Sequence, residues 1–153
     1  MRLRGYFDPE LIELNLDSTS KDDVLKELAS MLELTEKSEA MLVRMLMKRQ
    51  EIGSTGIGRG IALVYSRLLG FSEVRIGFGR QREGIDFKAI DGKPVFYFFL
   101  MVGPPIDVPS EYLPVMGAWA QFAKEPDVPD LLANVKTPEE FLRLIEAKDI
   151  QRS

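Results

Sequence analysis

The chain of 153 residues has the length of one globular domain, and its 45% hydrophobic and 29% charged content is typical of such a domain. The net charge of −4 provides no electrostatic footprint for a nucleic-acid partner. The chain has no cysteine and no histidine, which excludes disulfides, thiol nucleophiles and imidazole bases, and we expect no metal and no cofactor.

The N-terminal residues 1–10, MRLRGYFDPE, lack the apolar core of a signal peptide. The longest apolar run, from Val95 to Val102, is too short to span a bilayer. These two observations predict a cytoplasmic protein without direct membrane insertion.

Two helices are expected in the first third of the chain. Residues 18–34, STSKDDVLKELASMLEL, open with hydroxyl residues suited to an N-cap and then place apolar side chains at helical spacing. Residues 35–50, TEKSEAMLVRMLMKRQ, follow the same pattern and place Leu42, Met45 and Leu46 on one face.

Strands are expected in the middle of the chain. Residues 61–65, IALVY, form a short apolar strand, and residues 73–79, EVRIGFG, alternate in polarity as a strand does. Residues 87–103 carry an Asp91-Gly92 turn signal between two apolar runs, which predicts a hairpin. The second run is apolar on both faces, as in a central strand covered on both sides.

Two further helices are expected near the C-terminus. Residues 109–125, PSEYLPVMGAWAQFAKE, read as a helix whose first turn is kinked or shortened by Pro114. The last helix starts with Thr137 as N-cap, Pro138 at its first position and Glu140 completing a capping box. Helices and strands in this order predict a single α/β domain over residues 1–153.

Residues 51–65, EIGSTGIGRGIALVY, hold four glycines within eight residues. A dinucleotide-binding loop leaves a buried strand and opens a helix, whereas this loop follows a helix-like segment and precedes a strand. A Walker A loop ends in Gly-Lys-Ser/Thr, and this loop ends in Gly-Arg-Gly. The order of elements argues against a nucleotide site and leaves open a tight turn in which glycine supplies positive φ.

The same string resembles the enzyme IIA domain of the bacterial sugar phosphotransferase system, of the fructose, mannitol and nitrogen-regulatory type. In that family an arginine ends a helix, a Gly-Ser-Thr-Gly-Ile-Gly loop follows, and a strand ending in Pro-His presents the histidine that carries phosphate. Arg49, the loop at residues 53–58 and the run GIAL at residues 60–63 match this pattern in order and spacing.

Three other segments extend the resemblance over residues 11–148. Residues 16–32 look like the first helix of the family, residues 83–104 like its central hairpin, and residues 111–122 like a helix that begins with Glu-His-Leu. The resemblance implies a mixed central β-sheet flanked by helices on both faces.

The chain departs from the family at its two histidines. Val64-Tyr65 stands where the family has Pro-His, and Tyr112 stands where the family often has a second active-site histidine. An imidazole with a pKa of about 6.5 is a good nucleophile near neutral pH, whereas a phenol with a pKa of about 10 is a weak one. A tyrosine phosphate is also a much poorer phosphoryl donor than a phosphohistidine.

We therefore expect no catalytic residue, and a binding site built from Arg49, Ser54, Thr55, Tyr65 and Tyr112. Arg49 is either an oxyanion binder beside free loop amides or an exposed residue favoured by the helix dipole. The two tyrosines either contact a ligand or pack together in the space of the two imidazoles.

The resemblance implies an ancestral phosphoryl transfer from a histidine-containing carrier protein toward a sugar permease or a regulatory target. With no histidine, we expect a regulatory or protein-binding module that docks on a regulatory target or on phosphotransferase-system components. Two alternatives stay open, a phosphocarrier that uses Ser54, Thr55 or Tyr65 as acceptor and a sensor of small anions or metabolites in the old phosphate pocket.

Overall fold

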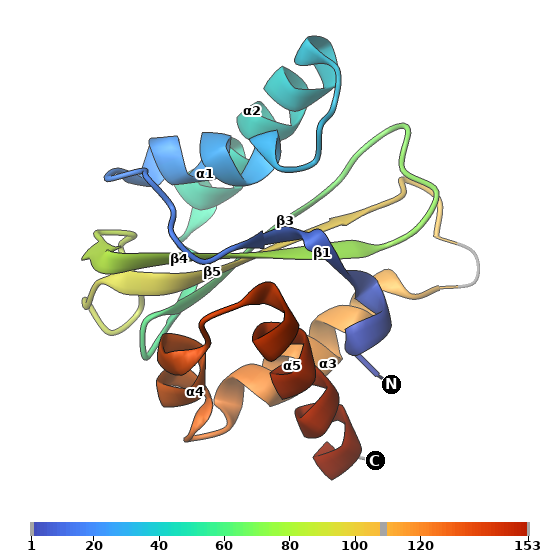
Figure 1. Ribbon diagram of the computed structural model, residues 1–153. Coiled ribbons are helices and arrows are strands. Elements are labelled where there is room, and N and C mark those ends of the chain that lie inside the picture. The colour runs from blue at the N-terminus through green and yellow to red at the C-terminus, as the bar shows by residue number, and fades with distance from the viewer. Residues whose placement is uncertain (1, 108–109, 153) are drawn as a thin grey trace.

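The computed structural model describes residues 2–107 and 110–152, and its centre is a five-stranded sheet in the order β1-β4-β5-β3-β2 (Figure 1). β1 pairs in parallel with β4 and β3 in parallel with β5, while the β4–β5 and β2–β3 pairs are antiparallel. The predicted mixed sheet is confirmed. The strands are β1 (Phe7–Glu13), β2 (Gly56–Gly58), β3 (Ile61–Arg67), β4 (Arg75–Ile85) and β5 (Val95–Gly103).

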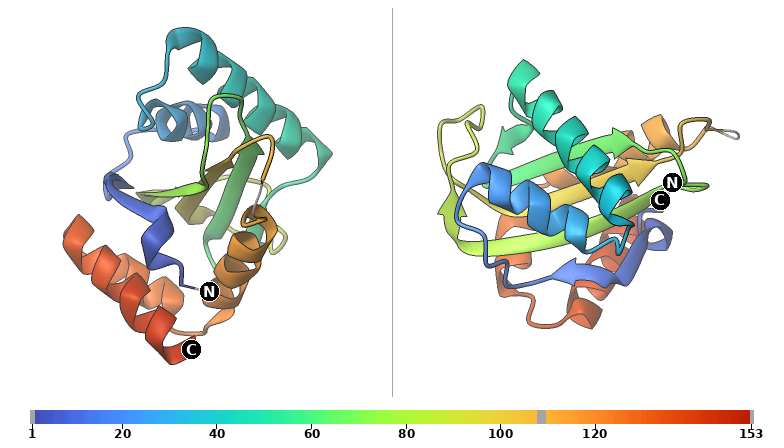
Figure 2. Two further views of the ribbon diagram at one scale, coloured as in Figure 1. Left: turned by 90° about the vertical axis from the view of Figure 1, so that its right-hand side faces the viewer. Right: turned by 90° about the horizontal axis from the view of Figure 1, so that it is seen from above.

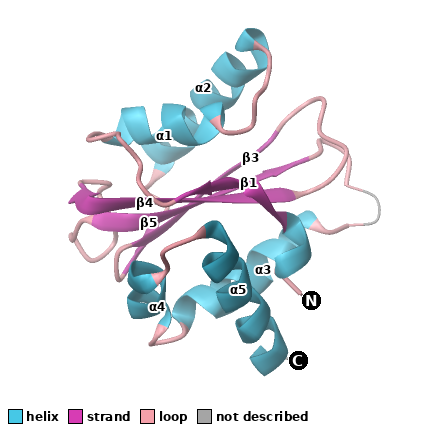
Figure 3. Ribbon diagram, viewed as in Figure 1, coloured by secondary structure: helices cyan, strands magenta, loops and turns pink. Residues whose placement is uncertain are grey.

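Helices cover both faces of the sheet, as the resemblance implied (Figures 1 and 3). One face carries α1 (Lys21–Ser30) and α2 (Glu36–Ile52). The other carries α3 (Tyr112–Lys124), α4 (Val128–Asn134) and α5 (Pro138–Arg152). None of the described helices has both the length and the apolar composition that a bilayer crossing needs.

The central strand β5 separates two hydrophobic cores. Its residue Phe98 is buried with α1 and α2, and its neighbour Phe99 is buried with α3 and α5. Phe99 makes an edge-to-face contact with Trp119, with 5.5 Å between ring centroids. The expectation of an apolar central strand covered on both sides is therefore confirmed.

The N-caps of α1, α2 and α5 are formed by the predicted hydroxyl residues, but the capping box of α5 differs from the prediction. Ser20 and Thr35 accept backbone N–H groups from the first turns of α1 and α2. Thr137 accepts the N–H of Glu140 in the same way, at 3.1 Å. The Glu140 carboxylate, however, accepts the N–H of Lys136, one residue before the predicted cap, so the capping box is displaced by one residue.

The helix predicted over residues 109–125 begins at Tyr112. Pro114 lies in its first turn, where a backbone N–H has no helical partner, so the proline shortens the helix rather than kinking it. Pro109, the first residue of the predicted helix, lies outside the described residues.

The predicted hairpin exists, but its first arm was placed wrongly. β4 runs without a break from Arg75 to Ile85 and pairs with β5, so the strand expected at residues 73–79 is the start of that arm. Residues 87–90 belong to the connection, in which the Gly92 N–H donates to the carbonyl of Ala89.

Four elements were not predicted: the short 3-10 helix η1 (Arg4–Tyr6), the edge strands β1 and β2, and the short helix α4. The pairing of β1 with β4 is interrupted between Phe7 and Ile12. The chain just before β1 is held by α5, because the buried Asp149 carboxylate accepts the N–H groups of Leu3 and Arg4, each at 2.8 Å. The two ends of the chain consequently lie close together (Figure 2).

Candidate functional site

The glycine loop leaves the C-terminus of α2 and leads into β2 and β3, so a helix precedes it and strands follow it. Two side chains predicted as binders hold this loop in shape. The Thr55 hydroxyl is buried and accepts a hydrogen bond from the Gln50 amide at 2.9 Å. The Ser54 hydroxyl donates to the Phe87 carbonyl at 2.5 Å and accepts the N–H of Gly56. The loop is thereby tied to the β4–β5 connection.

Arg49 lies in the last turn of α2 and faces Tyr65 on β3. Its Nε donates to the Tyr65 hydroxyl at 2.9 Å, and its guanidinium carbon lies 5.4 Å from the centre of the phenol ring. Its Nη1 donates to the carbonyl of Gly53 at 2.8 Å, just after the end of the helix. One side chain thus binds a carbonyl just after the end of the helix and also contacts the tyrosine, while oxyanion binding by Arg49 stays a prediction.

Tyr112, the first residue of α3, is only 4% exposed and lies beneath a second arginine. The guanidinium carbon of Arg67 is 4.3 Å from the centre of the Tyr112 ring, within the range of a cation–π contact. Burial raises the pKa of Tyr112 to about 12, although Arg67 acts in the opposite direction and Tyr65 adds to the rise. Tyr112 therefore stays a neutral phenol at physiological pH.

Arg67 was missed by sequence reasoning. It follows Tyr65 by two residues on β3, so the two side chains point to the same face of the strand. That spacing was the signal that could have identified it.

These four side chains border an open hollow of about 490 Å³, which we call the tyrosine rim. Three of the lining residues are cationic and none is acidic, and Ile52 among them is 83% exposed. The structure thus brings Arg49, Tyr65 and Tyr112 together, whereas Ser54 and Thr55 do not line this hollow. The lining residues are Met45, Lys48, Arg49, Ile52, Tyr65, Ser66, Arg67 and Tyr112.

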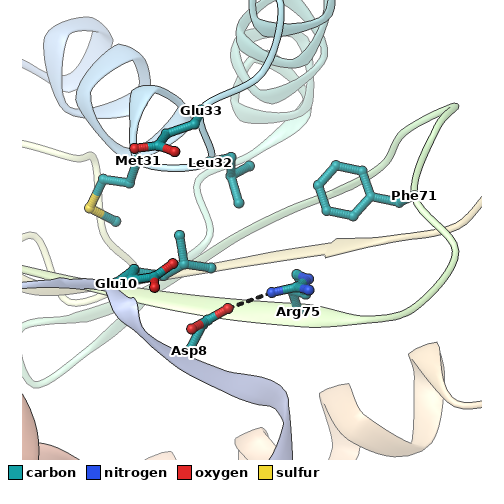
Figure 4. A pocket seen from close by; sticks show the side chains of 8 residues that line it. Asp8, Glu10, Met31, Leu32, Glu33, Phe71 and Arg75 are labelled. Carbon is teal, nitrogen blue, oxygen red and sulfur yellow. Dashed lines mark hydrogen bonds and ion pairs between the residues drawn. The ribbon is translucent and has the colours of Figure 1, made fainter.

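A different hollow, of about 500 Å³, opens between β1 and the segment that follows α1 (Figure 4). Arg75 donates to Asp8 at 2.5 Å, and Glu10 and Glu33 also line the space. None of the residues predicted for the site lies here. Across the described residues, no three acidic side chains are grouped so as to hold a metal ion.

Comparison with known proteins assigns the chain to a family. The model of the family described as phosphoenolpyruvate-dependent sugar phosphotransferase system, EIIA 2, matches residues 5–148. The nitrogen regulatory protein of Bradyrhizobium diazoefficiens is 31% identical over 129 residues, which cover 84% of each chain. The fructose-specific EIIABC component of Bacillus subtilis is 28% identical over 103 residues, which are 66% of this chain and 16% of that protein.

Solved structures lead to the same family. The crystal structure of the nitrogen regulatory protein IIA-Ntr from Neisseria meningitidis superimposes with a TM-score of 0.83 and 27% identity, over 94% of this chain and 98% of that one. The complex of enzyme IIAMtl with phosphorylated enzyme IIBMtl from Escherichia coli contains the same fold, with a TM-score of 0.71 and 17% identity over 92% and 99% of the two chains. The latter shows an EIIA domain bound to another protein of the phosphotransferase system. The chain described here belongs to the EIIA 2 family of the phosphoenolpyruvate-dependent sugar phosphotransferase system.

Proposed function

We propose that this chain is a cytoplasmic EIIA-like regulatory domain that has lost histidine phosphorylation and acts by binding other proteins. One observation carries the proposal. The chain has no histidine, and from the resemblance we infer that Tyr65 and Tyr112 stand at the two histidine positions of the family. An arginine contacts each phenol ring, so both rings have packing partners of their own.

The geometry gives little support to a substitute phosphoryl acceptor. Tyr112 is buried and its pKa is about 12, so its phenolate is scarce at neutral pH. The Thr55 hydroxyl is enclosed beside Gln50, and the Ser54 hydroxyl is bonded to the β4–β5 connection. Tyr65 is partly exposed, but an aryl phosphate there would be a poor donor for a relay.

Phosphorylation can be tested directly by incubating the protein with phosphoenolpyruvate, enzyme I and the histidine-containing carrier protein. We expect no acid-labile phosphoryl group by mass spectrometry. Tyr65→His alone should restore little, because Tyr112 would crowd an imidazole or a phosphate beside it. Tyr65→His combined with Tyr112→His should do better than either single change, and the effects should be non-additive because the side chains share one site. Stoichiometric labelling of the unchanged protein would refute the proposal.

The tyrosine rim is the surface that we propose for partner binding, with a regulatory target protein or a phosphotransferase-system component as the partner. It combines exposed apolar area at Ile52 and Met45 with Arg49 and Tyr65. Tyrosine and arginine are enriched at interface hot spots because each offers a large contact area with a polar end. Exposed Ile52 and Met45 beside the cationic side chains of this open hollow suit a protein partner, which can cover apolar and charged groups together.

Two substitutions should separate this docking role from simple filling of an abandoned pocket. Tyr65→Ala and Arg49→Ala are each expected to weaken capture of a cellular partner by about 1–2 kcal/mol or more. The melting temperature should change little, because both side chains are partly exposed. Arg143→Ala, at an exposed position on α5, is the matched control and should leave capture unchanged. A pull-down that recovers the same proteins with wild type and with the Tyr65→Ala, Arg49→Ala double mutant would reject the docking role.

A further inference from the structure

A small basic hollow lies toward the other end of β5 from the tyrosine rim, with a volume of about 200 Å³. Tyr97, which lines it, pairs with Ile61 at the start of β3, whereas Tyr65 at the rim lies four residues further along β3 and pairs with Met101. At about 3.3 Å per residue, four residues separate the two places by about 13 Å. The hollow is lined by Arg80, Gln81, Arg82, Phe96, Tyr97 and Ala133.

Arg80 is a buried cation whose hydrogen bonds all go to uncharged carbonyl groups. Arg80 is only 2% exposed, and its Nε donates to the carbonyl of Leu14 at 3.1 Å. Its Nη1 donates to the carbonyls of Leu132 and Val135, at 2.9 and 2.8 Å, and also to that of Ala133. These bonds cap the C-terminus of α4. They leave the second terminal nitrogen, Nη2, without a hydrogen-bond partner among the described residues.

Arg82 brings a second positive charge to the same hollow. It is exposed, and it lies two residues after Arg80 on β4. Within residues 2–107 and 110–152, neither guanidinium takes part in an ion pair with a carboxylate. Burial lowers the pKa of Arg80 and the neighbouring charge of Arg82 lowers it further. Two like charges beside one another are unfavourable unless an anion is shared between them.

The hollow also offers a hydroxyl donor and aromatic surface. Tyr97 is partly buried and lies opposite Arg80 in the β4–β5 register. Its ring and that of Phe96 have centroids 6.0 Å apart. The negative charge of Asp130 on α4 contributes to a raised pKa of Tyr97, but Asp130 is not among the residues that line the hollow.

Helix capping explains the position of Arg80 but not that of Arg82. Arg80 donates to the carbonyls of Leu132, Ala133 and Val135 at the end of α4. The Arg82 side chain makes no hydrogen bond or ion pair within the described residues. Two arginines around one small space provide two planar forks of N–H donors, the arrangement that fits the oxygens of a phosphate group.

We propose that this hollow binds the phosphate group of a small phosphorylated metabolite. The dianion lies between the guanidinium groups of Arg80 and Arg82, and the Tyr97 hydroxyl donates to it. The hollow accommodates the phosphate group, and the remainder of the ligand lies over the Phe96 ring. This site is separate from the tyrosine rim, so the proposal holds whether or not the rim docks a protein.

The test is a calorimetric titration of the full chain with inorganic phosphate and with glycerol 3-phosphate, at constant ionic strength. Both should bind saturably, and amide NMR shifts should map to residues 80–82 and 96–97. Arg82→Gln should weaken binding by about tenfold or more, the loss expected for one hydrogen bond between charged groups. Because Arg82 is exposed, this variant should fold normally, and Arg143→Gln provides a matched control that retains binding.

Three outcomes would overturn the proposal. Binding of neither probe at millimolar concentration would do so, and so would an Arg82→Gln variant that binds as wild type does. Shifts that map to Arg49, Tyr65 and Arg67 instead would place the anion at the tyrosine rim. Asp130→Asn, which removes a negative charge close to Tyr97, should leave binding intact or tighten it. Tyr97→Phe should weaken binding without loss of fold. Unchanged binding by this variant would show that the Tyr97 hydroxyl does not contact the phosphate group.

Discussion

Replacement of Tyr112 by alanine is expected to lower the free energy of unfolding by about 3 kcal/mol, the usual loss when a buried aromatic ring leaves a cavity. The residue is 4% exposed and belongs to the core between the sheet and α3. Urea denaturation would measure the change, with an unaltered m-value showing that the unfolded state is the same. Tyr65→Ala should cost clearly less, because Tyr65 is only partly buried.

Gly103 provides an internal control for this prediction. A Cβ atom at this position would lie 2.4 Å from Cδ2 of Tyr112, so the ring fits only because residue 103 is glycine. Gly103→Ala should therefore destabilise the native protein by roughly 1–3 kcal/mol through overpacking. In the Tyr112→Ala background the same change should lower the free energy of unfolding only slightly, because the ring that would clash with the new Cβ atom is absent. Additive effects of the two substitutions would show that Tyr112 does not pack there.

Asp149→Ala should have an effect of similar or greater size, about 3–5 kcal/mol. The carboxylate is buried and accepts the backbone N–H groups of Leu3 and Arg4 as well as pairing with Arg152. Alanine would leave two backbone donors without a partner and a guanidinium without its counter-charge. The chain before β1 should then detach from α5, which would appear as faster amide exchange of Leu3 and Arg4.

Glu146→Ala is the control for Asp149→Ala. Glu146 lies on the exposed side of the same helix, and its removal should change the free energy of unfolding by no more than about 0.5 kcal/mol. If Asp149→Ala were equally mild, the contact between α5 and the N-terminal segment would contribute nothing to stability.

The elements with regular patterns could be predicted from the sequence, and the irregular ones could not. The helical spacing of α1 and α2 and the doubly apolar β5 led to correct assignments. β1 was missed because Pro9 and alternating acidic residues hide its strand pattern. α4 was missed because it has only 7 residues and contains Pro129 near its start. Its position depends on contacts with Arg80 from a distant strand, which no local pattern reveals.

The site residues that belong to the family motif could be predicted from the sequence. The hydrogen bonds that those residues make in the folded chain could not. The motif brought Arg49, Tyr65 and Tyr112 to attention, and the structure places them around one hollow. A tight glycine turn leaves backbone N–H groups that nearby side chains satisfy: the Ser54 hydroxyl accepts that of Gly56, and the Gln50 amide oxygen accepts that of Thr55. The Thr55 hydroxyl is in turn bonded by the Gln50 amide. The role of Ser54 and Thr55 in binding stays a prediction.

The two edges of the sheet determine how this protein can meet other chains. β2 has only three residues, two of them glycine, and β1 contains Pro9 and loses its pairing register with β4. An incoming strand finds no long, regular row of N–H and C=O groups at either edge. Growth by strand addition, as in fibrils and in complexes that extend a sheet, is therefore disfavoured, and association has to proceed through side chains on the helices and at the strand ends.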